Sequence, residues 1–283
     1  MKHAYLILAH GQWDLLRTLL HCIDDERNDI FVHIDAKVQS LPRLYTDKAC
    51  LYMLDNRVDV RWGDLSVIKA EYALFEEALQ KGPYAYYHLL SGVDLPLKSQ
   101  DYIHSFCDEH QGKEFIGYTL TSITPEIARK VQRWHLFPRH FKSGNILIKA
   151  IRALFIRIQE TLGIKRNRDV DFKKGSQWVS VTERMARRFV DNKFWVLKTF
   201  SHTFCCDEIV MQTLCWHSPM REDIWSLQSD DRGCMRTIGW RNGHLYDWKA
   251  EDYSFLKNSN YLFARKFNDS DMRFIRKVVD LSK

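Results

Sequence analysis

The chain opens with Ala4-Tyr5-Leu6-Ile7-Leu8-Ala9, an uninterrupted apolar run that is typical of a strand buried on both faces of a parallel sheet. His10-Gly11-Gln12 interrupts the run, and residues 13–23 then carry apolar side chains at helical spacing. A second strand is expected at 29–35, where it ends on the carboxylate Asp35. This succession of strand, helix and strand predicts an α/β fold with a central, mostly parallel, twisted sheet flanked by helices.

The same alternation continues downstream. An extended piece is expected at 51–60, a helix at 67–79 and a further strand at 85–90. Repeats, low-complexity stretches and long linkers are absent from the sequence, so residues 1–283 are expected to form a single domain. Ligands of open parallel sheets bind outside the carboxyl ends of the strands, where His33, Asp35, the turn 61–63 and the segment 91–96 are expected to lie.

Residues 137–168 break this pattern and are predicted to form a basic amphipathic helical insertion. Residues 145–164 are rich in aliphatic side chains, with Lys149, Arg152 and Arg157 interleaved. The segment is too charged to span a bilayer, but it could lie in the interface plane with its cations toward anionic head groups. The alternative is an ordinary surface helix packed on its own sheet. We keep both interpretations open.

Composition and charge narrow the class of protein. The chain is 45% hydrophobic and carries a formal charge of +6, and its basic residues concentrate between 129 and 188, with 16 Lys/Arg against 4 Asp/Glu. This basic belt suits a phosphate-rich ligand, a nucleic acid or an anionic membrane. The seven cysteines are an odd number without a CxxC motif, so neither a disulfide scaffold nor a structural zinc site is expected. We expect a cytoplasmic protein without a signal peptide or membrane span.

Two adjacent carboxylates, Asp207 and Glu208, precede residues 209–214, which have helical apolar spacing. Acids in a first helical turn are favoured by the helix dipole, and one of them could be a simple N-cap. A second cluster, 261–267, contains adjacent cations, and a third, 174–178, is a Gly-Ser-aromatic turn at the start of a strand expected at 175–181. A carboxylate, a pair of cations and such a turn are the parts that a sugar-transferring site needs.

The sequence lacks the common dinucleotide and phosphate-binding motifs and has two candidate sites for a metal carboxylate. The sequence has neither a GxGxxG after its first strand nor a P-loop. Asp169-Val170-Asp171 spells the carboxylate pair that often holds Mn²⁺ or Mg²⁺, but it lies in a polar stretch and is interpreted as a solvated loop. Asp94, at a strand end, could be a metal carboxylate or a turn-stabilising residue before proline, the interpretation we favour. We therefore expect no metal and no other cofactor.

The sequence resembles the Core-2/I-branching β-1,6-N-acetylglucosaminyltransferases in seven short stretches, which occur in the order found in that family. That family, glycosyltransferase family 14, also holds the peptide O-xylosyltransferases, and the chain looks most like its short bacterial members. The stretches are Ala-Tyr-Leu-Ile-Leu-Ala-His (4–10), Val-His-Ile-Asp (32–35), Trp-Gly-Asp (62–64), Leu-Leu-Ser-Gly-Val-Asp-Leu-Pro-Leu-Lys (89–98), Lys-Gly-Ser-Gln-Trp (174–178), Cys-Asp-Glu (206–208) and Leu-Phe-Ala-Arg-Lys-Phe (262–267).

The resemblance implies a GT-A-like fold and an inverting transferase that uses a UDP-sugar without a divalent metal. It assigns Glu208 as the catalytic base, and Lys266 and Arg236 to the diphosphate. Arg265, next to Lys266, is either a second diphosphate contact or a surface residue. Positions expected around the uridine are His10, His33, Asp35, Arg61, Trp62 and Gly63. Positions expected around the sugar or acceptor are Asp94, Ser176, Trp178 and Asp207, where Trp178 is either a stacking platform for a sugar or part of the core.

The expected reaction is transfer of N-acetylglucosamine, or alternatively xylose, from its UDP-sugar to a hydroxyl of a glycan or lipid-linked oligosaccharide. Such a bacterial enzyme would serve capsule or lipopolysaccharide assembly, with peripheral contact to an anionic membrane. Residues 118–173 align poorly with the family, so the identity of the acceptor does not transfer. The alternative is a non-catalytic basic protein that binds nucleic acid or anionic membrane. Nucleic acid is disfavoured because the basic belt lacks the regular aromatic residues that stack on bases.

Overall fold

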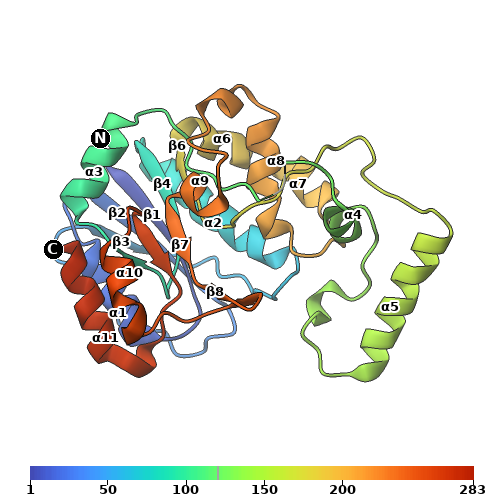
Figure 1. Cartoon of the computed structure of the whole chain (residues 1–283), viewed down its shortest axis with the longest axis horizontal. Helices are drawn as coiled ribbons and strands as arrows, with labels where there is room; N and C mark the ends of the chain where they lie inside the picture. The colour runs from blue at the N-terminus through green and yellow to red at the C-terminus, as the bar shows by residue number, and fades with distance from the viewer. Residues whose placement is uncertain (120) are drawn as a thin grey trace.

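The computed structural model describes residues 1–119 and 121–283, and its centre is a five-stranded sheet in the order β3-β2-β1-β4-β6 (Figure 1). Strands β1, β2, β3 and β4 run parallel to their neighbours, and β6 pairs antiparallel with β4. The strands are β1 (His3–Ala9), β2 (Asn28–Ile34), β3 (Cys50–Met53), β4 (Tyr86–Ser91) and β6 (Ser180–Thr182). The predicted α/β, GT-A-like class with a mostly parallel sheet and flanking helices is confirmed.

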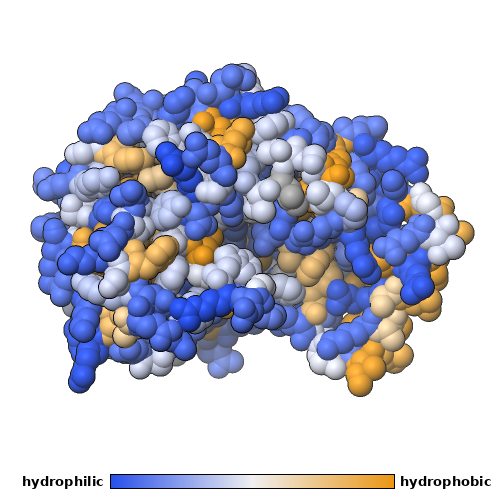
Figure 2. All heavy atoms as spheres, viewed as in Figure 1, coloured by the Kyte–Doolittle hydropathy of each residue, from blue (hydrophilic) through white to orange (hydrophobic). Residues whose placement is uncertain are grey.

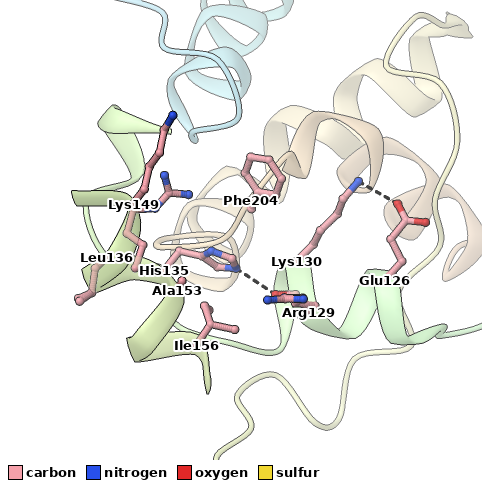
Figure 3. Close-up of a pocket in the computed structure, with 10 residues that line it drawn as sticks. Glu126, Arg129, Lys130, His135, Leu136, Lys149, Ala153, Ile156 and Phe204 are labelled. Atoms are coloured by element: carbon pink, nitrogen blue, oxygen red, sulfur yellow. Dashed lines mark hydrogen bonds and ion pairs between the residues drawn. The ribbon is translucent and has the colours of Figure 1, made fainter. Parts of the chain in front are cut away.

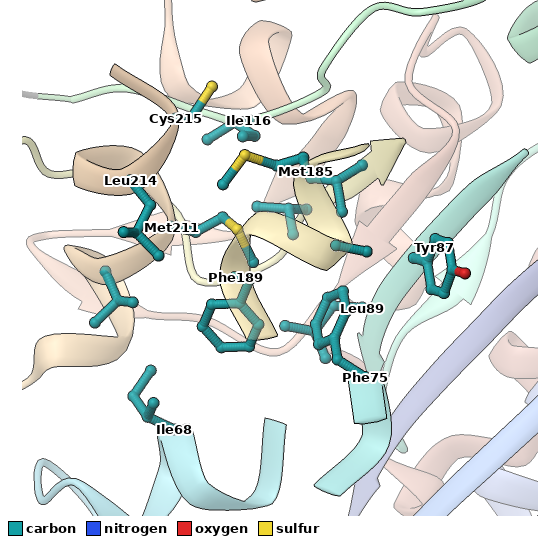
Figure 4. Close-up of a cluster of buried hydrophobic side chains, with 14 of the residues drawn as sticks. Ile68, Phe75, Tyr87, Leu89, Ile116, Met185, Phe189, Met211, Leu214 and Cys215 are labelled. Atoms are coloured by element: carbon teal, nitrogen blue, oxygen red, sulfur yellow. The ribbon is translucent and has the colours of Figure 1, made fainter. Parts of the chain in front are cut away.

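Each face of the sheet has its own core because successive side chains of a strand point to opposite faces. Leu6 and Leu89 face one core, which is closed by α2 (Ser66–Lys81), α6 (Glu183–Asp191) and α8 (Val210–Trp216) (Figure 4). The other core lies under α1 (Trp13–Cys22), α3 (Gln100–Glu109) and α11 (Met272–Val279), and its strand residues include Tyr5, Ile7, Val32 and Leu90. The uninterrupted apolar run of β1 is thus explained by burial on both sides.

A small second sheet brings the C-terminal part of the chain to the end of β4. Strand β10 (Phe263–Arg265) lies between β5 (Leu95–Pro96), with which it is antiparallel, and β7 (Arg236–Ile238), with which it is parallel. A two-stranded hairpin, β8 (Trp240–Arg241) and β9 (His244–Leu245), follows β7. The pairing of β10 with β5 places Arg265 and Lys266 beside the turn that leaves β4.

The remaining elements are short except α5, which has 16 residues. They are the α-helices α4 (Pro125–Val131), α5 (Ile146–Thr161), α7 (Lys193–Thr199), α9 (Asp230–Cys234) and α10 (Tyr253–Lys257), and the 3-10 helices η1 (Pro138–His140), η2 (Cys206–Glu208), η3 (Pro219–Asp223), η4 (Ala250–Asp252), η5 (Asp269–Asp271) and η6 (Asp280–Ser282).

Three predicted elements differ in extent from the structure. The extended piece predicted at 51–60 ends at Met53, and the segment predicted to be a strand from 175 forms strand structure only at Ser180. Gly175 explains the second difference: a Cβ there would lie 1.9 Å from the carbonyl oxygen of Gly117, so this stretch is a close crossing of two backbones. Asp207 and Glu208 lie in η2, and the helix that they were expected to begin starts at Val210.

Helix α5 stands at one end of the molecule, away from the central sheet (Figure 1). The side chain of Asn145 caps its first turn by accepting hydrogen bonds from the backbone of Leu147 and Ile148. The inner face buries Ile156 and Gln159, and the Gln159 side chain bonds both the N–H and the carbonyl of Trp134. The predicted helix is confirmed, but it packs on the 134–141 loop and not on the sheet.

The segment that carries α5 leaves and returns to the body at one point. The Asn167 side chain donates hydrogen bonds of 3.0 Å to the carbonyl of Val131 and 2.9 Å to that of Thr199. The backbone N–H of Arg166 donates to the carbonyl of Gln132 at 3.2 Å. Residues 131–132 and 166–167 are therefore fastened together. In the part of the chain that the structure describes, no helix has the length and hydrophobicity to cross a membrane.

Candidate active site

Glu208 ends η2 on a loop whose backbone is fixed on both sides. The N–H of Cys205 donates a 2.9 Å hydrogen bond to the carbonyl of Gly63, and the carbonyl of Glu208 accepts one of 2.9 Å from Gly175. Cys205 has a positive φ of 48°, which turns the chain sharply into η2. These bonds hold the Glu208 carboxylate between the turn 61–63 and the turn 174–178.

The Glu208 carboxylate belongs to a cluster of two acids and two lysines. Lys130 Nζ lies 3.2 Å from it and Lys174 Nζ 3.6 Å, and both ammonium groups are also 3.1 Å from the carboxylate of Glu126. Burial alone would lower the pKa of Lys130, but the charges of Glu208 and Glu126 outweigh it and raise that pKa. The hydrogen bond from Lys130 lowers the pKa of Glu126. The Glu208 side chain remains 37% exposed, so a substrate can reach it.

Asp207 points the other way, into the protein. Its Oδ1 is buried and bonded to no group among the described residues. Burial raises the pKa of Asp207 to about 7, and the negative charge of Glu208 adds to this shift. The nearby Glu71 is buried on α2, where burial raises its pKa well above the usual range and Gln177 donates a 2.7 Å hydrogen bond to it. The structure thus separates the two acids: Glu208 faces solvent and Asp207 supports the loop from within.

Arg265, Asp94 and Trp178 form one packed unit at the end of β4. The Arg265 guanidinium pairs with the buried Asp94 carboxylate at 2.8 Å, and its centre lies 4.2 Å above the Trp178 ring. Asp94 also accepts hydrogen bonds from the backbone and the hydroxyl of Ser91, which is the turn-stabilising role expected before Pro96. Trp178 is buried in the core with Arg265 over its ring, as in the second of its two expected roles, and the charge of Arg265 is largely balanced by Asp94.

Ser176 connects this unit to the Glu208 loop. Its buried hydroxyl accepts a hydrogen bond of 3.2 Å from the backbone of Trp178, and its own N–H donates one of 2.8 Å to Asp230. Burial raises the pKa of Asp230, and the charge of Glu208 contributes. Ser176 thus lies within the support of the site.

Lys266 lies at the edge of the site with a partly exposed side chain. Its Nζ is 2.7 Å from the Asp247 carboxylate, and the backbone carbonyl of Lys266 accepts a 2.9 Å hydrogen bond from Trp248. Because this ion pair is partly solvated, its net stabilisation is small, about 0–1 kcal/mol, and a diphosphate can compete for the lysine.

Arg236 occupies a different environment from that expected of a diphosphate ligand. It is only 1% exposed, and its guanidinium donates to the carbonyls of Cys234 at 2.6 Å and Val179 at 2.7 Å and to the hydroxyl of Ser180 at 3.0 Å. Burial lowers its pKa. With its donors directed to core acceptors, Arg236 joins β7 to β4 and β6 and does not present a cation at the surface of the site.

The residues expected around the uridine lie at the carboxyl ends of β1 and β2 and in the loop after β3. His10 is exposed after β1. His33 is buried, burial lowers its pKa, and its Nε2 accepts a 2.8 Å hydrogen bond from Val58. The Asp35 carboxylate is buried and pairs with Lys37 at 2.5 Å. His33 and Asp35 therefore anchor the 58–63 loop, and His10 is open to a ligand.

The turn 61–63 presents its own polar and aromatic groups. Arg61 pairs with Asp59 at 2.8 Å, and Trp62 is exposed with its ring edge against Phe204, the ring centroids 5.4 Å apart. Gly63 has a φ of +79°, and a Cβ at this position would lie 2.7 Å from the Phe204 ring. Only glycine satisfies both the conformation and this approach.

Two groups of candidate metal ligands lie in the described part of the chain. Asp171 is exposed and pairs with Lys173 at 2.6 Å, in agreement with a solvated loop for 169–171. His3, His88 and Cys107 are buried and offer ligand atoms within 4.8 Å of one another. Burial lowers the pKa of His88 strongly, and the guanidinium of Arg236 lowers it further. That fixed cation opposes a bound metal ion, so we assign none there.

Sequence reasoning missed the lysines that contact Glu208. Lys174 was recognised only as part of its turn, and Lys130 only as part of the basic belt. The detectable signal was Glu126 four residues before Lys130, a spacing that pairs side chains on one face of a helix. The third partner, Lys174, is brought in by tertiary structure alone.

Comparison with known proteins completes the description of the site. A search of curated proteins found no matching relative. The family model of the Core-2/I-Branching enzyme matches residues 3–275, which include every element of the site described above. The chain therefore belongs to the Core-2/I-branching enzyme family, glycosyltransferase family 14, and is a glycosyltransferase.

Proposed function

We propose that the protein is an inverting transferase that moves a sugar, N-acetylglucosamine in the first instance, from a UDP-sugar to a glycan hydroxyl. The observation that supports this most is the position of Glu208, exposed on a loop that is hydrogen-bonded to both the Gly63 turn and the Gly175 turn. UDP-xylose is the second donor to test, because the family also includes xylosyltransferases.

In the proposed reaction the acceptor hydroxyl attacks C1 of the donor sugar. Its proton passes to the Glu208 carboxylate, the new C–O bond forms, and the bond from C1 to the diphosphate breaks with its electron pair leaving on UDP. One positioned base is sufficient, because UDP leaves with little help from an acid. The acceptor and the leaving group lie on opposite faces of the sugar, which inverts the configuration at C1.

Lys266 is the cation best placed to stabilise the departing diphosphate. Its ion pair with Asp247 is partly exposed and can be exchanged, whereas the guanidinium of Arg265 is held by Asp94 and Trp178. Arg265 then acts chiefly by shaping the edge of the diphosphate site. His10, Arg61 and Trp62 supply the exposed groups for the nucleoside, and His33, Asp35 and Gly63 shape the loop beneath it.

The cations take the role that a divalent metal has in other GT-A enzymes. Activity is therefore expected to be unchanged after dialysis against EDTA. Loss of activity in EDTA that Mn²⁺ restores would contradict this part of the proposal.

The apolar outer face of α5 is proposed to seat the enzyme on an anionic membrane. Leu147, Leu154 and Leu162 are each more than 60% exposed, and Figure 2 shows apolar side chains gathered along this end of the molecule. The exposed cations Arg157 and Lys165 lie on this helix and just after it. Apolar burial combined with attraction to anionic lipid is the mode by which interfacial helices bind. This location suits a lipid-linked acceptor in the assembly of a bacterial surface polysaccharide.

The substitution Glu208→Gln tests the proposal because it keeps the shape of the side chain and removes the base. Release of UDP in the presence of acceptor should fall by about 10²–10⁴-fold while the affinity for UDP is retained. Glu126→Gln is the matched control, since it removes the other carboxylate from the same two lysines and should cost less than about tenfold. Full activity of Glu208→Gln would remove Glu208 as the base.

A further inference from the structure

A cavity of about 370 Å³ lies between α4 and α5, next to the Glu208 cluster (Figure 3). Its size is at the small end of the range for ligand pockets, about 300–1,000 Å³. The lining residues come from α4, the loop after it, α5 and the loop before η2: Glu126, Arg129, Lys130, His135, Leu136, Lys149, Arg152, Ala153, Ile156 and Phe204.

The cavity wall has an excess of positive charge. Arg129 is 3.7 Å from Glu160, and Lys130 pairs with Glu126, so the charges of these two cations are partly balanced. Within residues 1–119 and 121–283, Lys149 and Arg152 form no ion pair with a carboxylate. Lys149 and Arg152 are thus two cations without an acidic partner in that part of the chain, on the α5 side of the cavity. They suit a ligand that carries roughly two negative charges.

Arg152 is held in place although it has no acidic partner. Its guanidinium lies 4.1 Å above the Phe141 ring, and its Nε is buried with no hydrogen bond to any group in the described residues. Burial lowers the pKa of Arg152, and no acid among the described residues raises it again. A buried donor of this kind is costly unless a ligand binds it.

One residue of the cavity wall, Lys130, also contacts the proposed base. Its Nζ lies 3.2 Å from Glu208, and the N–H of Phe204 donates a 3.1 Å hydrogen bond to the carbonyl of Lys130. The expected diphosphate contacts Arg265 and Lys266 lie on another side of Glu208. Gly175 is hydrogen-bonded to Glu208, and Trp178 of the same turn contacts Arg265. None of these four residues lines the cavity. A group in the cavity therefore lies near the base, on residues other than the expected diphosphate contacts Arg265 and Lys266.

We infer that this cavity binds a phosphate or diphosphate group of the acceptor, attached to the sugar whose hydroxyl Glu208 deprotonates. The inference rests on the proposed function and specifies its acceptor as a phosphorylated glycan. Lys149 and Arg152 supply the charge, the planar guanidinium suits two phosphate oxygens, and Leu136, Ala153 and Ile156 give an apolar wall for the linked chain.

Calorimetric titration with inorganic pyrophosphate in saturating UDP tests the site directly. The wild-type protein should bind pyrophosphate beside UDP, and Lys149→Gln should weaken that binding about tenfold, since one close cation is lost. Lys149 is exposed, so the variant should fold normally. The matched control Lys198→Gln, an exposed lysine outside the cavity, should change the affinity by less than about twofold. Absence of binding in the presence of UDP, or equal affinities of Lys149→Gln and wild type, would overturn the inference.

Transfer assays identify the source of the phosphate. The acceptors are one sugar in three forms: free, as a soluble sugar phosphate, and joined through diphosphate to a short prenyl chain. At least one charged form should have a KM about tenfold below that of the free sugar, and Lys149→Gln should abolish that advantage with little change in kcat. A preference for the soluble or for the prenyl form identifies the source, and equal KM values for all three forms would overturn the inference.

The failure of the proposed function has a separate readout. Slow hydrolysis of the UDP-sugar by the wild-type protein without acceptor reports on the proposed function alone. If the wild-type protein hydrolyses no UDP-sugar, the proposed function fails, while the pyrophosphate titration still reports on the cavity.

Discussion

The carbonyl of Gly63 accepts a hydrogen bond from the N–H of Cys205, so the turn expected to hold the nucleoside and the loop that carries Glu208 are joined through their backbones at 2.9 Å. The Phe204 ring fills the space where a side chain at position 63 would begin. A change at either residue should therefore affect nucleotide binding and the position of the base together.

Gly63→Ala should lower both stability and UDP affinity. The added Cβ would lie 2.7 Å from Phe204 at a φ of +79°, and relief of that contact requires movement of the loop before η2. We expect a loss of about 1–3 kcal/mol in the free energy of unfolding, measured with urea, and weaker UDP binding by calorimetry. Gly112→Ala is the control, because Gly112 has a φ of +86° with no atom within 4 Å of its added Cβ. If both variants lose the same stability, backbone conformation accounts for the effect and the contact with Phe204 does not.

Substitution of Arg236 should mainly lower stability, whereas substitution of Lys266 should mainly lower the rate of transfer. Arg236→Met removes buried hydrogen bonds to the carbonyls of Cys234 and Val179 and to the hydroxyl of Ser180, so the free energy of unfolding should fall by at least about 1–3 kcal/mol. Lys266→Gln should leave stability within about 1 kcal/mol of wild type but slow transfer by about 10²–10³-fold. Urea unfolding and steady-state rates of both variants check this assignment. A stable Arg236→Met protein with a slow rate would instead return Arg236 to the diphosphate.

Asp207 should make stability depend on pH. Burial raises its pKa from 3.8 to about 7, so between these values the folded protein binds a proton that the unfolded chain has lost. The free energy of unfolding should fall as pH rises through this window, by at most about 1.4 kcal/mol per pH unit from this group, and stay lowered above it. Asp207→Asn should become more stable relative to wild type between pH 4.5 and 7. If the free energies of unfolding of the two proteins differ by a constant amount across that pH range, Asp207 does not have the raised pKa.

The outer face of α5 should bind vesicles that contain anionic lipid. Leu154 is 62% exposed, so Leu154→Asp should reduce co-sedimentation with such vesicles by about tenfold without loss of stability. Leu227→Asp, at a leucine that is 53% exposed on another part of the surface, is the matched control and should bind as wild type does. Failure of the wild-type protein to sediment with anionic vesicles at low salt would exclude the membrane role.

The central sheet was predictable because its strands have local signals. The apolar run of β1 and the helical spacing of α2 depend only on neighbouring residues, and both elements form where expected. The strand predicted from 175 was too long because the approach of Gly175 to Gly117 is a tertiary contact that no local pattern reports. Family motifs predicted Glu208 and Lys266 as site residues, and both are accessible in the structure.

The environment of each site residue was less predictable. Arg236 is a charged residue, and its neighbours in the sequence do not indicate that it is buried. It is buried because β7 packs against β4 and β6. Lys130 and Lys174 are separated in sequence from Glu208. Lys130 reaches it from α4, and Lys174 from the turn 174–178, whose Gly175 N–H donates to the Glu208 carbonyl. Such placements depend on tertiary distances, which residue spacing does not contain.

The hydrogen bonds of Asn167 and Arg166 to residues 131 and 132 make the intervening stretch an exchangeable module. Because residues 133–165 enter and leave through one fastened neck, a homologous stretch of different length can be grafted there without moving the sheet. The stretch includes Lys149 and Arg152 of the proposed acceptor site, whereas Glu208 and Lys266 lie outside it. A chimaera made at this neck should inherit its donor from one parent and its acceptor from the other.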